Sequence, residues 1–427
     1  MNWRNNPLLK TGLISTIARF AGVGLNFAVA ILLTRTLPMD EAGMVFMLMT
    51  LVTGVALFSR LGVEQWVVRE VARLSSSEQS QQIYYLQAAY ALTLRSSLIF
   101  MLGWLLVSPL MQHWLFDNSI YPPLLWLAVL GIPAFNLIML NSTFLKAVQK
   151  TADSILVQNS LPAISYMLAL LMGWFYYRSE QHYLLLYTGS LIIAAIASFY
   201  WLKPWWRTLK HKHATPFSLK TVLNQSLALA PVSFFSFLML WADTLLTGWL
   251  LSNADVALFT VAARLSFISL FFLGALDATI YPRLLNIHKY NPAQLKSFFW
   301  QSTGLVAGVL VAVTVLLLIA GELILNIFKP EYIAASGTLA LLLIAQLIRA
   351  FSLTFSFMFI MENQVRYLNS LLGFALIINI LANLFLIPKF GIEGAATATL
   401  SANFVLTAGV IWLFFKNHLL NLHKQTQ

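Results

Sequence analysis

Long apolar runs alternate with short polar connectors along the whole of the 427-residue chain. A helix needs about 20 predominantly apolar residues to cross the hydrocarbon core of a bilayer, and a longer run can tilt. The pattern therefore predicts an all-α polytopic membrane protein with twelve spans. Their expected ranges are 11–35, 42–60, 86–112, 122–146, 154–177, 183–202, 222–250, 255–281, 298–320, 332–361, 367–387 and 394–415.

Composition leads to the same class of protein. Hydrophobic residues make up 59% of the chain and charged residues only 10%, whereas a soluble domain has about 25% charged residues. The net charge of +11 would suit a nucleic-acid-binding protein, but the basic residues are scattered through connectors, so nucleic acid is not an expected partner. The chain has no cysteine, which excludes disulfides, thiolate catalysis and cysteine-ligated metal sites.

The basic connectors also predict an orientation. Cytoplasmic connectors of membrane proteins carry more lysine and arginine than those on the opposite side. With the N-terminus inside, the cytoplasmic connectors hold eighteen such residues, and the opposite connectors hold four, which are Arg35, Arg178, Lys329 and Lys389. We therefore expect both termini to face the cytoplasm. The first apolar run is longer than the core of a signal peptide, so we expect it to be retained.

The longest basic connector, residues 203–220, separates six predicted spans from six. We expect an N-terminal six-helix bundle over 1–202, a cytoplasmic basic linker over 203–220 and a C-terminal six-helix bundle over 221–427. A six-helix unit returns the chain to its starting side, so two related units would form a parallel repeat about an axis along the membrane normal. Secondary transporters with such repeats bind their substrate between the halves, near the bilayer midplane.

A weak internal repeat supports this plan. The stretch ILLTRTLPMDEAGMVFMLMTLV (31–52) aligns with TLLTGWLLSNADVALFTVAARL (244–265) at a constant offset. Each stretch consists of a helix end with Leu-Leu-Thr, a short polar turn and the start of the next helix. At the same offset Glu64 falls on Asp277.

Four arginines lie inside the predicted spans, and they carry most of the functional signal. An isolated arginine at the centre of a membrane helix costs roughly 2.5–3.5 kcal/mol. Four would cost about 10–14 kcal/mol, comparable to a typical protein's net stability of roughly 5–15 kcal/mol. Asp243 is the only clearly central acid in the spans. The four arginines, Arg19, Arg95, Arg264 and Arg349, are therefore expected to face water, counter-charges or a ligand.

Helical spacing places two of these arginines on polar stripes. Ser15, Arg19 and Asn26 share one face of the first span, and Gln346 shares a face with Arg349 in the tenth. A cationic cavity favours an anionic cargo, and the guanidinium fork matches phosphate bidentately. The alternative for any single arginine is a structural role, bonded to backbone carbonyls or to Asp243. The predicted substrate-binding residues are Arg19, Arg95, Arg264, Arg349, Ser15, Asn26 and Gln346.

Three stretches resemble the polysaccharide (O-antigen type) flippase family of the multidrug/oligosaccharidyl-lipid/polysaccharide exporter superfamily. LLTRTLPMDEAGMVF (32–46) is similar to that family's turn between helices 1 and 2, and RLGVEQWVVREVARL (60–74) to its segment entering the first cytoplasmic loop. IPKFGIEGAATATLSANFV (387–405) is similar to its connection between helices 11 and 12. The chain departs from the pattern at Arg60, where an aspartate is common.

The resemblance implies a MATE-like fold and a lipid-linked oligosaccharide, typically on undecaprenyl pyrophosphate. Such a cargo is turned from the cytoplasmic to the outer leaflet of the bacterial inner membrane, in contact with membrane lipid and with polysaccharide polymerase machinery as an expected neighbour. The family shares no catalytic residues, so a transporter without a catalytic, metal or cofactor site is expected. Coupling to a proton or sodium gradient is left open, with Asp243 and Glu64 as candidate residues.

Two alternatives stay open. One is a drug or cation antiporter of the same superfamily, although cationic drugs favour acidic cavities and the spans hold four arginines. The other is a membrane-embedded polysaccharide polymerase or glycosyltransferase. Such enzymes usually need a substantial extramembrane loop or an acidic or histidine-rich cluster, and the sequence shows neither.

Overall fold

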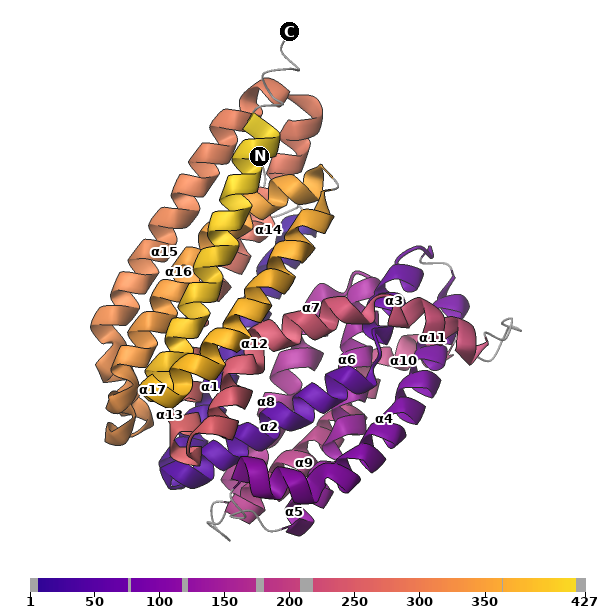
Figure 1. The fold of residues 1–427 in the computed structure, drawn as a ribbon. Coiled ribbons are helices and arrows are strands. Elements are labelled where there is room, and N and C mark those ends of the chain that lie inside the picture. The colour runs from indigo at the N-terminus through magenta and orange to yellow at the C-terminus, as the bar shows by residue number, and fades with distance from the viewer. Residues whose placement is uncertain are drawn as a thin grey trace. The chain divides into compact units, whose positions relative to one another are not determined.

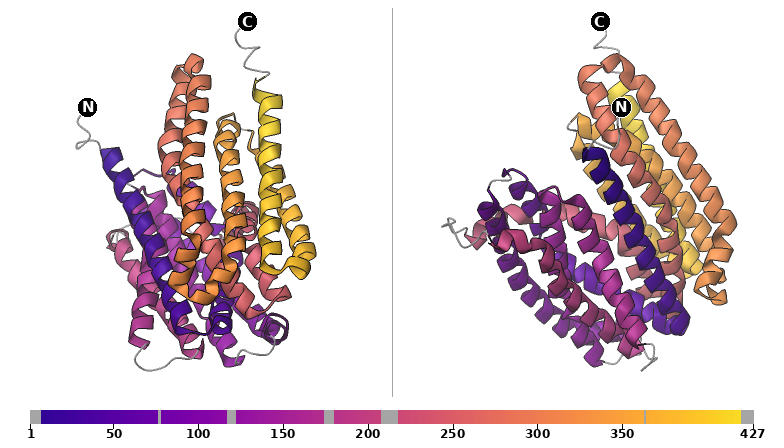
Figure 2. Two further views of the ribbon diagram at one scale, coloured as in Figure 1. Left: turned by 90° about the vertical axis from the view of Figure 1, so that its left-hand side faces the viewer. Right: turned by 180° about the vertical axis from the view of Figure 1, so that it is seen from behind.

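The computed structural model describes residues 7–75, 78–116, 122–173, 180–207, 218–362 and 364–419. Every regular element in these ranges is helical. Contacts divide the chain into two compact units, Met1–Leu238 and Met239–Gln427, and the dividing point lies inside helix α12. We call them the first unit and the second unit. Figure 1 labels their helices and Figure 2 gives two further views.

The first unit contains α1 (Pro7–Thr36), α2 (Met39–Ser59), α3 (Val63–Val71), α4 (Gln79–Phe116), α5 (Pro122–Ala128), α6 (Gly131–Ala147), α7 (Thr151–Ile155), the π-helical turn η2 (Leu156–Ser160), α8 (Leu161–Gly173), α9 (Glu180–Ser198), η3 (Phe199–Leu202), α10 (Lys203–Trp206), α11 (Leu219–Leu227) and the start of α12 (Ala230–Leu250). The second unit contains the rest of α12, α13 (Asn253–Ser266), α14 (Ile268–Tyr290), α15 (Pro292–Phe328), η5 (Pro330–Ala335), α16 (Ser336–Met361), α17 (Val365–Phe414) and η6 (Phe415–Leu419).

The described residues contain eleven helices that are long and apolar enough to cross a membrane, against the twelve spans predicted. The difference arises at the C-terminal end, where Arg366–Asn417 forms one continuous 52-residue segment that contains the predicted spans 367–387 and 394–415. A straight helix of that length would measure about 78 Å, far more than the hydrocarbon core of about 30 Å. Large aliphatic side chains point outward, for example Leu106 at 81% exposure and Ile319 at 80%. The protein is thus a multi-pass membrane protein.

Gly391 explains how the 52-residue segment fits within the thickness of a membrane. Its backbone is left-handed, with φ 57° and ψ −138°, and α17 turns back on itself there as two antiparallel arms (Figure 1). Pro388 lies just before the kink. A Cβ atom at Gly394 would lie 2.3 Å from the carbonyl oxygen of Leu386, so only glycine permits this close return. Both arms pack beside α16.

Helix α6 lies at the centre of the first unit, where it packs against α2, α3, α4, α7 and α9. Its buried face carries Ile138, Leu140, Phe144 and Leu145. In the second unit the core joins α14, α15, α16 and α17. An aromatic cluster contributes to it, in which the Phe299 ring stacks on Phe414 with centroids 5.3 Å apart.

The two stretches of the internal repeat form the same local structure. α1 ends at Thr36 and α2 begins at Met39, while α12 ends at Leu250 and α13 begins at Asn253. At the constant offset of the alignment these boundaries agree within one residue. The start of α13 is fixed by a capping box, in which Ser252 and Asp255 each accept from the other's backbone N–H.

The predicted span 222–250 is two helices rather than one. The short amphipathic α11 ends at Leu227, and α12 begins at Ala230, one residue before Pro231. Proline is tolerated at the start of a helix because the first N–H groups have no partner within it. α11 packs on α3 and α4. Of the predicted linker 203–220, residues 208–217 lie outside the described part, and the division into bundles over 1–202 and 221–427 stays a prediction.

Candidate functional site

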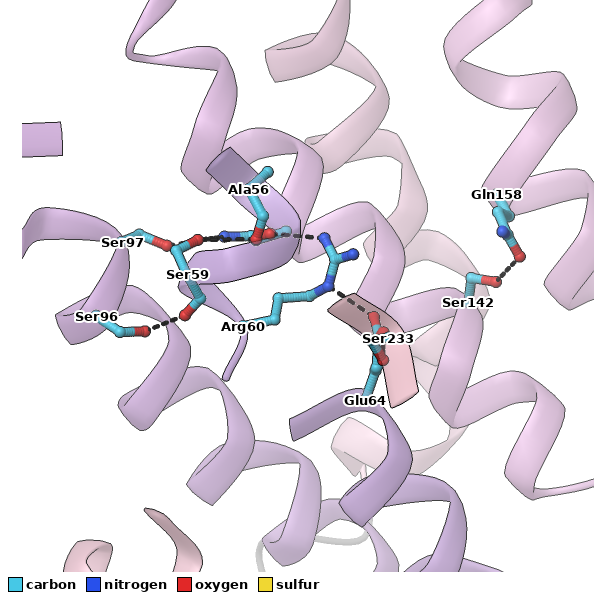
Figure 3. A network of polar contacts seen from close by, with 10 residues as sticks. Ala56, Ser59, Arg60, Glu64, Ser96, Ser97, Ser142, Gln158 and Ser233 are labelled. Carbon is cyan, nitrogen blue, oxygen red and sulfur yellow. Dashed lines mark hydrogen bonds and ion pairs between the residues drawn. The ribbon is translucent and has the colours of Figure 1, made fainter. Parts of the chain in front are cut away.

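A buried polar network lies at the C-terminal end of α2 in the first unit (Figure 3). Arg60, the residue after that helix, is 1% exposed. Its Nε donates to Glu64 Oε2 at 2.7 Å, and its Nη1 donates to Asn136 Oδ1 at 2.8 Å. The Asn136 amide nitrogen donates onward to the Ser59 hydroxyl at 2.7 Å and the Ser97 hydroxyl at 2.9 Å. The guanidinium is therefore neutralised and held by three helices.

Glu64 lies on α3, outside the eleven candidate spans. Its second carboxylate oxygen accepts from the Ser233 hydroxyl of α12 at 2.7 Å. Burial by itself would raise the pKa of Glu64, but the Arg60 guanidinium and the Ser233 hydrogen bond outweigh it and hold the pKa below the ordinary value of 4.5. Glu64 is therefore ionised at neutral pH and committed to an ion pair.

The turn between Arg60 and Glu64 depends on a strained backbone. Leu61 and Gly62 are both left-handed, with φ 50° and φ 76°. A Cβ at Gly62 would lie 2.3 Å from the Ser226 carbonyl oxygen and 2.6 Å from the Ala230 backbone nitrogen. This close approach of α11 and α12 is possible only because residue 62 has no side chain.

The predicted residues Ser15, Arg19 and Asn26 all lie on α1, which packs along α7, η2 and α8. Arg19 is exposed, and the described residues offer its side chain no hydrogen bond or ion pair. Ser15 is buried, and its hydroxyl has no hydrogen-bond partner among the described residues. The Asn26 amide nitrogen donates to the Asn159 carbonyl oxygen of η2 at 3.4 Å. The predicted stripe therefore meets the π-helical turn.

The second unit holds a buried carboxylate that neutral groups surround. Asp243, on α12, is 7% exposed. Its Oδ1 accepts from the amide nitrogens of Asn379 at 2.9 Å and Asn383 at 2.7 Å, both on α17. Its Oδ2 accepts from the Thr399 hydroxyl on the other arm of α17. No described cation lies within ion-pair distance of it.

Asp243 lines a cavity formed by α12, α13, α16 and α17, with about 430 Å³ of empty space including its open mouth. Arg349 and Gln346 of α16 line the same cavity. The Arg349 side chain has no hydrogen-bond or ion-pair partner among the described residues, and the buried Gln346 Oε1 also lacks one. The cavity thus combines an unpaired guanidinium, an unpaired amide oxygen and a carboxylate that already accepts three hydrogen bonds.

The remaining predicted arginines lie on other helices. Arg95 is exposed on α4, and Arg264 is half-buried on α13 but does not line the cavity. The structure therefore groups Gln346 and Arg349 with Asp243 in the second unit. It groups Ser15, Arg19 and Asn26 along α1 in the first unit. The side chain of Asp277, the repeat partner of Glu64, lies outside the described residues.

Several residues of the two buried polar networks were missed from the sequence. Asn379 and Asn383, four residues apart, bind Asp243 from the predicted span 367–387, and asparagine inside a membrane span is a signal in its own right. Asn136 is a similar case in the predicted span 122–146. Arg60 lies in the connector after α2, as its position in the sequence predicts, but its burial was not predicted.

The chain is similar to known proteins in sequence and in fold. Residues 8–288 match the model of a family described as polysaccharide biosynthesis protein. None of the curated proteins compared with the chain matches it. Among solved structures, the lipid II flippase MurJ in an inward closed conformation superposes with a TM-score of 0.73 at 14% identity, covering 95% of this chain and 87% of MurJ.

MATE transporters are also similar in fold. A multidrug resistance MATE family transporter of the MOP superfamily superposes in its inward-facing conformation with a TM-score of 0.67 at 14% identity, covering 93% of this chain and 97% of the transporter. A multidrug resistance MATE family transporter of the MOP superfamily in an outward-facing conformation superposes with a TM-score of 0.64 at 15% identity, covering 100% of this chain and 98% of the transporter. The predicted MATE-like fold is therefore confirmed.

Proposed function

Because the chain belongs to the polysaccharide biosynthesis protein family, we propose that it is a flippase for a lipid-linked oligosaccharide. The family resemblance inferred from three motifs is confirmed by this match. The proposed cargo is an oligosaccharide on undecaprenyl pyrophosphate, destined for O-antigen or a similar surface polysaccharide. The proposed site of action is the bacterial inner membrane, with both chain termini in the cytoplasm and no chemical step performed on the cargo.

The observation that carries the proposal is the unpaired guanidinium of Arg349. An uncompensated arginine within a membrane span is costly, so it is retained where it meets water, an anion or a carboxylate. Arg349 lines a cavity and has no ion-pair partner among the described residues. Two phosphate groups supply the charge and the acceptor oxygens that a guanidinium fork binds best. Arg19 of α1, which also has no ion-pair partner among the described residues, would bind the cargo as well.

Coupling to an ion gradient is a second part of the proposal, and Asp243 suits it better than Glu64. Glu64 is neutralised by Arg60 at 2.7 Å. Asp243 has no cation within ion-pair distance in the part of the chain that the structure describes. It is held by two amides and a hydroxyl, all of which also carry oxygen atoms. A proton on this carboxylate, or a sodium ion among these oxygens, would neutralise its charge. The three-carboxylate or histidine clusters typical of metal centres are absent from the described residues.

A flipping assay with the protein reconstituted in lipid vesicles tests the function. The purified protein is placed in liposomes with undecaprenyl pyrophosphate carrying a labelled oligosaccharide, and exposure of the label on the far leaflet is measured. Arg349→Glu is expected to slow flipping at least about tenfold, and Arg349→Lys less, because lysine keeps the charge but not the fork. Arg366→Glu changes an exposed arginine at the start of α17 and is expected to flip normally.

Wild-type vesicles that fail to flip the labelled lipid, or an Arg349→Glu variant as active as wild type, would each contradict part of the proposal. The first result removes the flippase, and the second removes Arg349 from the site. The competing antiporter function predicts export of cationic compounds by the same vesicles. The cavity argues against it, because its one described carboxylate already accepts three hydrogen bonds.

A further inference from the structure

The π-helical turn η2 places three polar residues in a row inside a membrane-spanning segment. Gln158, Asn159 and Ser160 form the end of this turn, within the candidate span Thr151–Gly173. A π-helical turn inside an α-helix is rare and often marks a functional site. Polar side chains in a membrane span are costly unless partners or water satisfy them. Their hydrogen bonds therefore show whether they serve packing or a ligand.

Packing accounts for the neighbouring serines but not for these three residues. The Ser142 hydroxyl is bonded to Ser154 at 2.9–3.0 Å, a satisfied link between α6 and α7. By contrast, Gln158 has a single weak contact, in which its Oε1 accepts from Ser142 at 3.4 Å (Figure 3). Its amide nitrogen and the whole amide of Asn159 have no partner among the described residues. The Ser160 hydroxyl is 4% exposed and also has none.

Helix α1 places polar residues beside η2. A Cβ at Gly22 would lie 3.0 Å from the Asn159 Cβ, so the two helices are in close contact there. Asn26 lies one turn further along the same face of α1, with its side-chain oxygen unused. Arg19, exposed and unpaired, lies three residues before Gly22. Neutral amides thus stand beside one free guanidinium.

The chemistry of this cluster, which consists of Asn26, Gln158 and Asn159, identifies the ligand class. The Asn26 amide nitrogen already donates to the Gly22 and Asn159 carbonyl oxygens, so Asn26 offers only its acceptor oxygen. Gln158 and Asn159 offer amide donors, and a sugar hydroxyl is both donor and acceptor, so the two match without any charge. A phosphate, which only accepts, would leave the amide oxygens unused. We propose that Asn26, Gln158 and Asn159 form a subsite for the first sugar residue of the cargo, next to Arg19. The inference rests on the proposed flippase function and adds a glycan-recognition site to it.

Binding of two lipids separates glycan recognition from pyrophosphate recognition. The purified protein is titrated with undecaprenyl pyrophosphate bearing one N-acetylhexosamine and, in parallel, with bare undecaprenyl pyrophosphate. Gln158→Leu and Asn159→Ala are each expected to weaken binding of the sugar-bearing lipid about two- to tenfold and to leave the bare lipid unchanged. Gln158 is exposed, so its replacement leaves the packing intact. Gln301→Leu, an exposed amide on α15, is the matched control and should change neither.

If the Gln158→Leu and Asn159→Ala variants lose equal affinity for the two lipids, or lose affinity for neither, the proposed subsite is overturned and the flippase function is unaffected. A wild-type protein that binds neither lipid would overturn the flippase function and the subsite with it.

Discussion

Arg60 and Glu64 form an ion pair, with the Arg60 Nε 2.7 Å from Glu64 Oε2. The left-handed turn at Leu61 and Gly62 separates α2 from α3 and lets the two side chains meet. Both ends of the pair are satisfied, since Asn136 accepts from the guanidinium and Ser233 donates to the carboxylate. One polar network therefore connects α2, α3, α6 and the start of α12 within the first unit.

Removing one partner of this pair should destabilise the protein strongly. Arg60→Leu leaves the Glu64 carboxylate buried without its cation, and loss of one partner of a buried pair costs about 3–5 kcal/mol. Arg60→Leu combined with Glu64→Leu should recover most of that loss, because no buried charge remains. Arg73→Ala breaks an exposed ion pair with Glu70 and should cost about 0–1 kcal/mol. Denaturant unfolding in detergent measures the free energy of unfolding of the three variants. Equal losses for Arg60→Leu and Arg73→Ala would contradict the prediction.

The same pair should make stability depend on pH in the acid range. The pKa of Glu64 is lowered in the folded protein, so its contribution is fully present above the ordinary value of 4.5 and is lost as the pH falls through the folded-state pKa. The melting temperature of wild type should therefore exceed that of Glu64→Gln at pH 7, and the gap should shrink below about pH 4.5. A gap that stays constant from pH 7 to pH 3 would show that ionisation of Glu64 contributes nothing.

Much of the helical architecture was predictable, because it depends on local apolar runs. The hairpin after Thr36 follows from Pro38, which breaks the helix. The span count differed only at α17, whose two arms, joined by the kink at Gly391, form one segment. The split at Ala230 was missed, although Pro231 marked it. A hydropathy pattern does not distinguish a proline that begins a helix from one within it.

The polar partners were harder to predict because they are distant in sequence. Asp243 is bound by Asn379 and Asn383, more than a hundred residues away. Linear position placed Arg60 correctly in the connector after α2, but its burial was not predictable, because it depends on Asn136 of α6. The spacing of polar residues located Arg349 and Gln346 correctly on one face of α16, since that relation is local.

Gly62 should tolerate no side chain. Gly62→Ala would place its Cβ 2.3 Å from the Ser226 carbonyl oxygen and would also have to hold a φ of 76°. Left-handed backbone alone costs roughly 1–2 kcal/mol for a residue with a Cβ, and the backbone contact adds to that. Gly103→Ala, at a helical glycine with open space around it, should be neutral or stabilising by up to about 1 kcal/mol. Thermal unfolding in detergent compares the two variants, and similar melting temperatures would contradict the argument.

Asp243 should control the response of flipping to an ion gradient. Asp243→Asn removes the titratable charge. Its amide oxygen can still accept from Asn379 and Asn383, and its amide nitrogen can donate to the Thr399 hydroxyl, so the fold should persist. In vesicles, flipping by wild type should rise when a proton or sodium gradient is imposed. The gradient should stimulate flipping by about 5- to 150-fold, which corresponds to coupling free energies of 1–3 kcal/mol. The Asp243→Asn variant should lose this stimulation. Asp255→Asn changes the half-buried capping-box carboxylate at the start of α13 and should keep the stimulation. Separate sodium and pH gradients identify the ion, and an Asp243→Asn variant that still responds to the gradient stimulating wild type would exclude Asp243 as the coupling residue.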